Sequence, residues 1–315
     1  MIRYVLNRLR SLFISLIFSS LVIFIMIEGV PGDAASFMLG INSSEDTVRA
    51  LKQELGLDEN LITRYFQWSY GMLTGDFGIS YTYRVPVKDL VIERASLSAP
   101  LAIYALVIAI AISFPAGFFA AKHYGKKSDY FIMGLAQLGI AIPNFWFGML
   151  LVLIFSINLN WFSAGGFPGW EDGFFIGMRS LTLPAIALAL PQAAILSRIL
   201  RSALIDTLQE DYIRTARAKG LNFSQAILRH AMKNALIPVL TIMGLQFSFL
   251  LAGAIIIENI FFLPGLGRLI FQGITQRDLI VVESVVMILV FSVILVNFLV
   301  DVAYAIIDPR LRKVV

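Results

Sequence analysis

The chain has 315 residues, of which 58% are hydrophobic and 15% are charged, and it contains no cysteine. A soluble domain is roughly 45–50% apolar and about 25% charged, so the composition argues against a soluble fold, and the lack of cysteine excludes disulfides, thiolate metal sites and cysteine nucleophiles. The formal net charge of +4 does not indicate a nucleic-acid partner, because the charges cluster in short stretches between long uncharged ones. We therefore expect one all-α integral membrane domain over residues 1–315.

The uncharged stretches are long enough to hold six membrane-spanning helices. The first, 11–27, follows a basic start, and no small-x-small cleavage site precedes Pro31, so we expect an uncleaved anchor rather than a removed signal peptide. The other spans are expected within residues 95–121, 130–170, 180–197, 234–257 and 284–300. The stretch 130–170 is too long for one span, and loop-favouring residues predict where its helix ends, with a re-entrant segment as the alternative: Asn158, Asn160, Gly165, Gly166 and Pro168.

The basic residues are distributed unevenly between the two sides of this arrangement. If the amino terminus is cytosolic, sixteen of the 25 Lys and Arg residues fall in cytosolic segments. This bias satisfies the positive-inside rule for six spans. We therefore expect a multi-pass protein of the bacterial cytoplasmic membrane with both termini in the cytosol.

Residues 31–95 are polar enough to form a small helical insertion outside the membrane. Ser44 can cap a first helix, in which Val48, Leu51 and Leu55 share one face before Gly56. Asn60 can begin a second helix and Pro86 a third. The insertion is therefore expected to hold three short helices.

The cytosolic stretch 202–235 is the most informative part of the sequence. Ile205, Leu208, Tyr212 and Ala216 recur at helical spacing, which predicts a helix with a narrow apolar stripe. Glu210 can pair with Arg214 one turn later, and Gly220 stands where a helix commonly ends.

A second, short helix is expected directly after this glycine. Asn222 can cap it, with Gln225 completing a partial capping box, and Phe223, Ala226 and Ile227 share one face. This apolar knob, ringed by Arg217, Lys219 and Arg229, would fit a groove on a partner protein. The alternative, weighed as equal on physical grounds, is an interfacial helix that lies on anionic lipid.

The run EDYIRTARAKGL at 210–221 resembles the coupling loop of permeases in the peptide and nickel import branch of the ATP-binding-cassette transporters. The resemblance covers nearly the whole chain. It includes RYVLNRL at the amino terminus, VPGD at 30–33, LTGDFGISY at 73–81, IPNFWFG at 142–148, PGLGRL at 264–269 and DPRLR at 308–312.

The resemblance implies which residues contact the ATPase. Arg214, Thr215 and Ala216 stand where the general permease consensus has Glu-Ala-Ala, and Gly220 is retained. His230, Met232 and Lys233 replace the Ile, Leu and Pro of that consensus. Because Arg214 stands in place of the consensus glutamate, no glutamate contact with the ATPase is carried over. The coupling set implied in this way is Arg214, Thr215, Ala216, Gly220, Asn222, Phe223, Ala226, Ile227 and Arg229.

The resemblance also implies a fold and an assembly. The fold is that of a type I importer permease, similar to the methionine importer, with six transmembrane helices and a small extracytosolic insertion after the first. The partners are a second related permease, favoured as a heterodimer, two cytosolic ATPase subunits, an extracytosolic solute-binding protein and membrane lipid. ATP and Mg would bind in the ATPase subunits, with no cofactor or metal on this chain. The cargo is expected to be a di- or oligopeptide, with nickel complexes or opine-like solutes as alternatives.

The residues give little support to an enzymatic function as the alternative to transport. The run at 125–128 lacks the earlier glycine and the Ser or Thr of a phosphate-binding loop, and Gly265 and Gly267 lack the third glycine of a dinucleotide site. The two histidines, His123 and His230, lie among basic cytosolic residues, so no buried Ser–His pair is available for a hydrolase. We therefore expect no catalytic residues on this chain.

A proton-coupled secondary transporter is the stronger rival, because Asp301 lies inside the last span near Asn297. A hydrogen bond between helices is the simpler interpretation of this acid. Five polar positions on the apolar spans are predicted either to line a substrate pathway or to bind helices together: Gln137, Asn144, Gln192, Gln246 and Asn297. The pathway set is Asn144, Gln192, Gln246 and Asn297, with Gln192 favoured because Pro184 and Pro191 should bend its helix.

Overall fold

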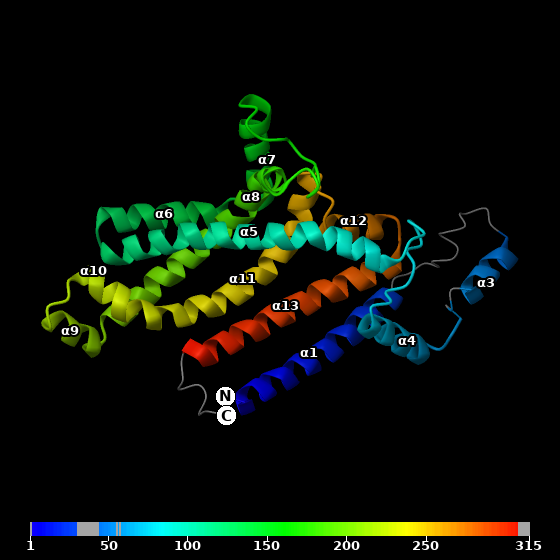
Figure 1. The fold of residues 1–315 in the computed structure, drawn as a ribbon, viewed down its shortest axis with the longest axis horizontal. Helices are drawn as coiled ribbons and strands as arrows, with labels where there is room; N and C mark the ends of the chain where they lie inside the picture. The colour runs from blue at the N-terminus through cyan, green and yellow to red at the C-terminus, as the bar shows by residue number, and fades with distance from the viewer. Residues whose placement is uncertain (1, 30–43, 55, 57, 308–315) are drawn as a thin grey trace. The chain divides into compact units, whose positions relative to one another are not determined.

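The computed structural model describes residues 2–29, 44–54, 56 and 58–307 (Figure 1). Within these ranges every regular element is helical, and the only extended pairing is an isolated antiparallel bridge between Ile79 and Pro86. The motifs at 30–33 and 308–312, together with Pro31 and Leu55, lie outside the described residues. The expected all-α fold is therefore confirmed for the described part of the chain.

Among the residues that the structure describes, five helices are long and apolar enough to cross a membrane. They are α1 (Ile2–Glu28), α5 (Val87–Lys122), α8 (Phe174–Leu208), the continuous helical run that ends with α11 (Met232–Ile260), and α13 (Leu279–Ile307). A sixth span is obtained if α6 (Lys127–Ala141), α7 (Asn144–Leu151) and the π-helical segment η1 (Val152–Asn158) count as one, although they bend by 97°. The six predicted spans agree with the count that includes this bent segment.

The bend between α6 and α7 has a local cause. Ile142 and Pro143 both take extended backbone angles, with ψ of 121° and 132°. A residue before proline is disfavoured in the helical region, because the proline ring clashes with its backbone. The helix therefore stops at Ala141 and restarts in a new direction at Asn144.

Residue contacts divide the chain into two compact units. The first comprises Met1–Leu9, Ala99–Leu263 and Leu295–Val315, and the second comprises Arg10–Ser98 and Pro264–Ile294. Each division falls inside a helix or at a helix-flanking turn, so α1, α5 and α13 contribute to both units. The two units are described separately below.

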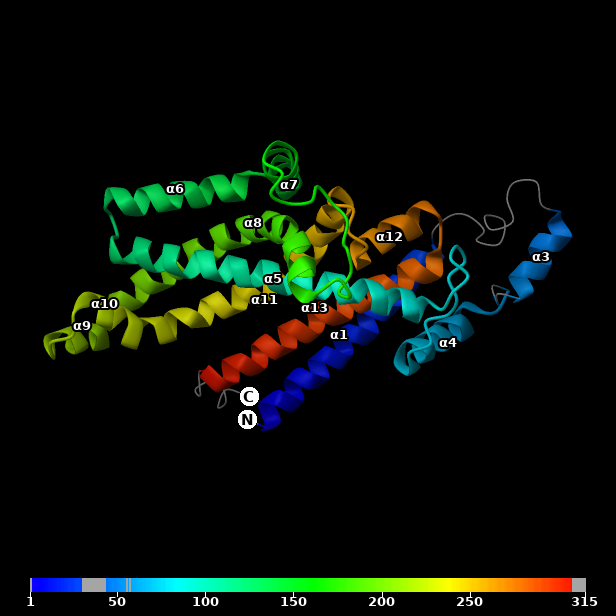
Figure 2. The same ribbon diagram turned by 45° about the horizontal axis from the view of Figure 1, so that its top comes forward.

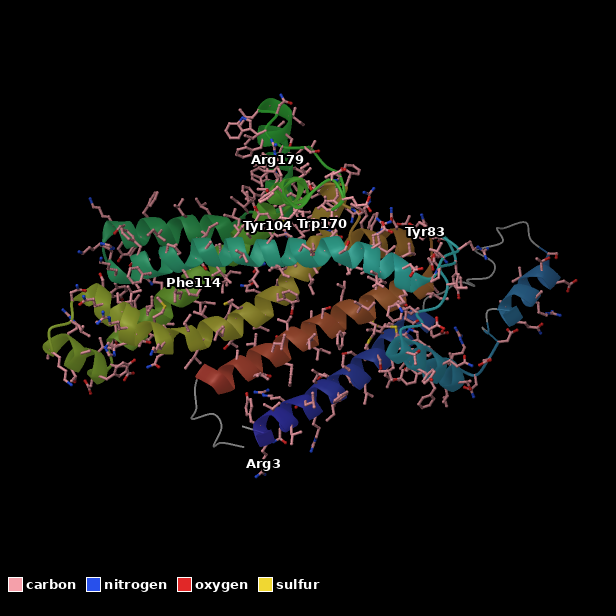
Figure 3. The ribbon with its side chains drawn as sticks, viewed as in Figure 1. Arg3, Tyr83, Tyr104, Phe114, Trp170 and Arg179 are labelled. Atoms are coloured by element: carbon pink, nitrogen blue, oxygen red, sulfur yellow. The ribbon has the colours of Figure 1, made fainter. Side chains whose placement is uncertain are left out.

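In the first unit, α8 packs against α6, α7 and α11 (Figures 1 and 2). Two glycines permit close approach: a Cβ on Gly139 would lie 3.1 Å from the Ala194 side chain, and a Cβ on Gly117 would lie 2.9 Å from the Ser197 carbonyl oxygen. The hydroxyls of Tyr104 on α5 and Thr182 on α8 lie 3.4 Å apart; Tyr104 is labelled in Figure 3. These contacts make α8 the central helix of the unit.

An ion pair fastens the turn between α5 and α6 to α8. Asp129 is fully buried and accepts a hydrogen bond of 2.7 Å from Nη2 of Arg201 and one of 3.0 Å from the backbone N–H of Gly125. The Arg201 guanidinium also lies 5.2 Å from the ring centroid of Tyr124. The basic run at 125–128 thus forms a turn and the start of α6.

In the second unit, α3 (Glu45–Glu54) and α4 (Leu61–Thr74) form the two predicted helices of the insertion. The Ser44 hydroxyl accepts from the N–H of Thr47 at 3.3 Å, and the Asn60 side chain accepts from the N–H of Ile62 at 3.1 Å, so both predicted caps are confirmed. The prediction of a separate third helix after Pro86 is wrong. The helix that begins at Val87 continues as α5 to Lys122, even though Pro100 and Pro115, which cannot donate an intrahelical hydrogen bond, lie within it.

The loop between α4 and α5 is anchored on the buried carboxylate of Asp278, which lies between α12 (Leu266–Thr275) and α13. This carboxylate accepts hydrogen bonds from the Ser80 hydroxyl and, at 2.9 Å, from the N–H of Thr82. Burial and the charge of Asp278 raise the pKa of Tyr81 to about 12, so its hydroxyl is neutral at physiological pH. Beneath the loop lies an apolar core: Val87, Leu90, Val91, Leu266, Leu269, Ile270, Val281 and Val285.

Asp129→Ala is expected to destabilise the protein by about 3 kcal/mol, because it leaves the guanidinium of Arg201 largely buried without its carboxylate. Thermal unfolding in detergent would show a melting temperature lower by roughly 5–10 °C. Asp206→Ala, which removes an exposed carboxylate from the same helix as Arg201, is the matched control and should leave the melting temperature unchanged. Equal melting temperatures for the two variants would show that the ion pair does not stabilise the fold.

Candidate coupling site between α8 and α11

The segment between α8 and α11 contains a break that the sequence did not reveal. We predicted one helix through Tyr212, but α8 ends at Leu208 and α9 (Asp211–Ala218) begins after an extended Glu210, whose ψ is 143°. The predicted pair between Glu210 and Arg214 is therefore wrong, and Nη1 of Arg214 instead lies 3.4 Å from Oδ1 of Asp211. Their side chains are 75% and 95% exposed, so this pair contributes little to stability.

The break also changes which side of α9 is buried. Ile213 and Ala216 are buried, whereas Tyr212 is exposed. The predicted stripe joined Tyr212 to Ile205 and Leu208 by continuous helical spacing, which the extended backbone at Glu210 interrupts. Of the predicted stripe on α9, only Ala216 faces inward.

Gly220 forms the corner after α9, as predicted. Its φ is +95°, in the left-handed region that favours glycine, and nothing lies within 4 Å of the position that a Cβ would take. The capping box that follows is complete: the Asn222 side chain accepts from the N–H of Gln225 at 2.9 Å, and the Gln225 side chain accepts from the N–H of Asn222 at 3.1 Å. The chain therefore leaves the corner in a defined direction.

The short helix after the corner does not stand alone, contrary to our prediction. α10 (Phe223–Ala226) passes directly into the π-helical segment η2 (Ile227–Ala231) and then into α11 (Figure 2). The three elements form one helical run from Phe223 to Ile260. The corner is thus joined without a loop to a helix long enough to cross a membrane.

The apolar knob also differs from the prediction. Ala226 and Ile227 are fully buried within the chain, because that face of α10 packs inward rather than toward a partner. The exposed apolar side chain is Leu228, at 58%, and Phe223 is half-buried with the Arg217 guanidinium 5.3 Å from its ring centroid. Asn222, Arg214, Thr215 and Arg229 remain exposed, as a contact surface requires.

A hydrogen bond that sequence reasoning missed holds α9 in place. The side-chain amide of Asn234, on α11, donates to the Tyr212 hydroxyl at 2.6 Å. The residues are 22 positions apart, and no local pattern joins them. Together with the contact between Arg217 and Phe223, this bond connects α9 to the start of the long helical run on both sides of the Gly220 corner.

The four predicted pathway residues lie on four different helices, α7, α8, α11 and α13. Gln192 on α8 and Gln246 on α11 are buried, and among the described residues neither side-chain oxygen has a hydrogen-bond partner. Asn144 and Asn297 are half-buried, and each lies close to a glycine of α11: Gly253 for Asn144 and Gly244 for Asn297. Both contacts bring an amide side chain against a helix backbone, which is how polar residues hold membrane helices together.

Asp301 has a structural partner in the first unit. Its carboxylate lies 3.1 Å from Nη1 of Arg8, and its backbone carbonyl accepts from the Tyr4 hydroxyl at 3.3 Å. An acid paired in this way joins the first and last helices and offers no proton relay by itself. The simpler interpretation of Asp301 is therefore the one that the contacts favour.

Comparison with protein families gives two matches that together span almost the whole chain. Residues 113–313 match the family described as "Binding-protein-dependent transport system inner membrane component". Residues 1–102 match the family described as "Binding-prot-dependent transport system membrane comp, N-term".

Individual relatives agree with these matches. The chain is 36% identical over 312 residues to the glutathione transport system permease protein GsiC of Escherichia coli (strain K12), with 99% of each chain covered. It is 38% identical over 308 residues to a protein of Brucella abortus (strain 2308) that is provisionally named a peptide transport system permease protein, with 98% of each covered. Among solved structures, the inward-facing MetNI methionine ABC transporter matches with a TM-score of 0.56 at 15% identity, over 70% of this chain and 96% of that one. The methionine-importer-like fold is thereby confirmed.

Tyr212→Phe is expected to loosen α9 without unfolding the protein, because it removes only the hydroxyl that accepts from Asn234. A loss of about 1 kcal/mol corresponds to roughly fivefold faster amide exchange in α9, measurable by hydrogen–deuterium exchange. Tyr130→Phe, at an exposed position of α6, is the control and should change nothing. Unaltered exchange in α9 of the Tyr212 variant would mean that this bond does not hold the helix.

Proposed function

This chain belongs to the family of binding-protein-dependent transport system inner membrane components, and from that membership we propose that its cargo is a di- or oligopeptide. It is the permease subunit of an ATP-binding-cassette importer, a membrane transport component and not the ATPase itself. Transport of this kind requires ATPase subunits and a solute-binding protein as partners. The cargo, the second permease and the orientation of the chain are the parts that we propose.

The observation that carries the cargo proposal is similarity over nearly the full length to relatives named for peptide substrates. The Brucella protein is provisionally named for peptides and the Escherichia protein for glutathione, which is itself a tripeptide. The matches cover 98% and 99% of this chain, so they include the spans as well as the cytosolic segments. Nickel complexes and opine-like solutes are not favoured by these names.

We place both termini and the Gly220 corner in the cytosol of a bacterium, in agreement with the distribution of basic residues. The partner permease is a second, related chain, and lipid covers the outer apolar faces. ATP and Mg are held by the two ATPase subunits rather than by this chain. The candidates for lining the pathway are Asn144, Gln192, Gln246 and Asn297, and we favour Gln192, whose buried side-chain oxygen has no hydrogen-bond partner among the described residues.

The corner between α9 and α10 is the proposed contact with an ATPase subunit. Arg214, Thr215 and Arg229 offer exposed polar groups there, and Leu228 offers an exposed apolar side chain. Movement of an ATPase subunit against this surface would act directly on α11, because α10, η2 and α11 form one helical run. The hydrogen bond between Tyr212 and Asn234 would make α9 move with that run.

Gly220→Arg is expected to abolish ATP-dependent uptake of a labelled dipeptide while the protein still inserts in the membrane. The substitution forces an L-residue to φ +95° and places a long side chain at the ATPase-facing corner. Gly125→Arg is the matched control, since Gly125 also has a positive φ, of +74°, and free space around its Cβ position.

The Gly125 variant should retain uptake, and cells depleted of ATP should lose it. Normal uptake by the Gly220 variant would refute the coupling role of this corner. Loss of uptake in both variants would assign the effect to backbone strain alone, and uptake that follows the proton gradient would refute ATP-driven import.

Leu228→Asp is expected to weaken association with the ATPase subunits by about 2 kcal/mol, roughly thirtyfold, because it buries a charge in an apolar contact. Co-purification of the ATPase subunits with tagged permease measures this directly. Ser202→Asp, which adds the same charge at an exposed position of α8, should leave co-purification intact. Undiminished co-purification of the Leu228 variant would instead favour the alternative in which this helix lies on lipid.

A further inference from the structure

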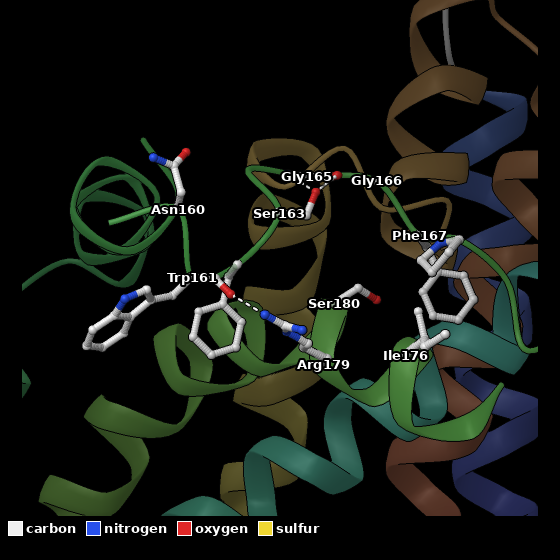
Figure 4. A pocket seen from close by; sticks show the side chains of 11 residues that line it. Asn160, Trp161, Ser163, Gly165, Gly166, Phe167, Ile176, Arg179 and Ser180 are labelled. Atoms are coloured by element: carbon white, nitrogen blue, oxygen red, sulfur yellow. Dashed lines mark hydrogen bonds between the residues drawn. The ribbon is translucent and has the colours of Figure 1, made fainter. Parts of the chain in front are cut away.

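A pocket of about 670 Å³ lies between the loop after η1 and the second turn of α8, wholly within the first unit (Figure 4). Its walls combine aromatic rings with a few polar groups, a composition typical of small-molecule sites. The residues that the argument uses are Asn160, Trp161, Phe162, Ser163, Arg179 and Ser180. None of the residues lining the pocket is acidic.

The loop that forms one wall is held in place by its own hydrogen bonds. The buried Ser156 hydroxyl donates to the Ser163 carbonyl at 3.1 Å, and the N–H of Gly166 donates to the Phe261 carbonyl at 2.8 Å. Gly165 lies so close to that carbonyl oxygen that a Cβ would be 2.7 Å from it. This conformation of the loop therefore requires glycine at position 165.

Arg179 is the only charged residue that lines this pocket. Its Nη2 donates to the Trp161 carbonyl at 2.7 Å, as the dashed line in Figure 4 shows, and its guanidinium lies 5.8 Å from the ring centroid of Phe162. Within the described part of the chain no carboxylate forms an ion pair with it. A guanidinium has five N–H donors in a planar fork, so orientation by one carbonyl leaves others for a ligand.

An oriented guanidinium without a counter-charge, next to aromatic walls and hydroxyls, suits a small carboxylate that carries an apolar group. We infer that this pocket binds the C-terminal carboxylate of a short peptide through Arg179. The Ser163 and Ser180 hydroxyls donate to the carbonyls of Gly165 and Gly177, each at 2.7 Å, so their oxygens can still accept from amide N–H groups of the peptide, and the Asn160 side chain can donate to a peptide carbonyl. The inference rests on the proposed function, and it names the cargo group that the permease itself recognises. In the proposed orientation the pocket opens on the extracytosolic side, where cargo arrives from the solute-binding protein.

A short peptide fits this pocket better than the other sources of an oxyanion. The volume lies within the roughly 300–1,000 Å³ usual for small-ligand sites. A lipid phosphate would need only the guanidinium of Arg179. It would leave the hydroxyls of Ser163 and Ser180 and the side-chain amide of Asn160 without a ligand contact. The experiment below separates these sources.

The test uses the complete importer, with partner permease and ATPase subunits, in nanodiscs of neutral phosphatidylcholine and without the solute-binding protein. Trp161 lines the pocket, so its fluorescence reports occupancy during titration with alanyl-phenylalanine or with the same dipeptide amidated at its C-terminus. We expect a saturable change with the free acid and binding at least tenfold weaker with the amide. Trp161→Phe should remove the signal.

Arg179→Gln is expected to weaken binding of the free acid at least tenfold and to leave the amide unaffected. Arg198→Gln is the matched control, because Arg198 is an exposed arginine of the same helix that donates to Gln137 and lies outside the pocket lining. Equal binding of acid and amide, or unchanged binding by the Arg179 variant, would overturn the inference. Loss of the wild-type signal in discs of anionic phosphatidylglycerol would also overturn it, by assigning Arg179 to lipid phosphate.

Failure of this inference is distinguishable from failure of the proposed function. ATP-dependent dipeptide uptake by cells carrying the unaltered chain tests the function alone. Uptake without binding at the pocket would refute the carboxylate site only, whereas absence of peptide uptake would refute the proposed cargo.

Discussion

A backbone N–H or C=O exposed to lipid without a partner costs several kcal/mol, and this constraint shapes most of the chain. Helices satisfy these groups internally, so the described residues form long helices joined by short turns. The irregular backbone is correspondingly concentrated in segments that carry their own hydrogen bonds. The loop after η1 pairs with the Phe261 carbonyl, and the loop between α4 and α5 pairs with the Asp278 carboxylate.

The same lipid environment explains why buried polar contacts hold the helices together. In an apolar surrounding, helices of similar hydrophobicity gain little from packing on one another rather than on lipid, so small residues and polar pairs fix their positions. Arg201 with Asp129 joins α8 to α6, and Arg64 with Glu28, at 2.9 Å, joins α4 to α1. Glycines of α5, α6 and α11 serve the same purpose by permitting close approach.

Local signals in the sequence predicted local structure well, because a cap or corner depends on few neighbouring residues. Ser44, Asn60, Asn222 and Gly220 all occupy the predicted positions. Proline was less informative: Pro100, Pro115, Pro184, Pro191 and Pro238 lie within helices, whereas Pro143 follows a helix end. The preceding residue is extended at Pro143 and helical at the other five, and the sequence alone did not show which prolines would end a helix. For the same reason neither the bond between Tyr212 and Asn234 nor the pocket at Arg179 was predicted.

The largest correction, the continuity of α10, η2 and α11, bears on the coupling role that we propose for this segment. If the short helix were attached through a flexible loop, the motion of an ATPase subunit would not be passed to the membrane span in a defined direction. A continuous helical run passes that motion along its axis. The π-helical segment lies between the two parts of this run, and such segments are rare and often found at functional positions because their hydrogen-bond pattern is shifted by one residue. A change of pattern at 227–231 would rotate the residues of α11 relative to the corner. One helical run, 223–260, would then both transmit the motion of an ATPase subunit and adjust the rotation of α11. It begins next to Gly220, whose positive φ sets its direction.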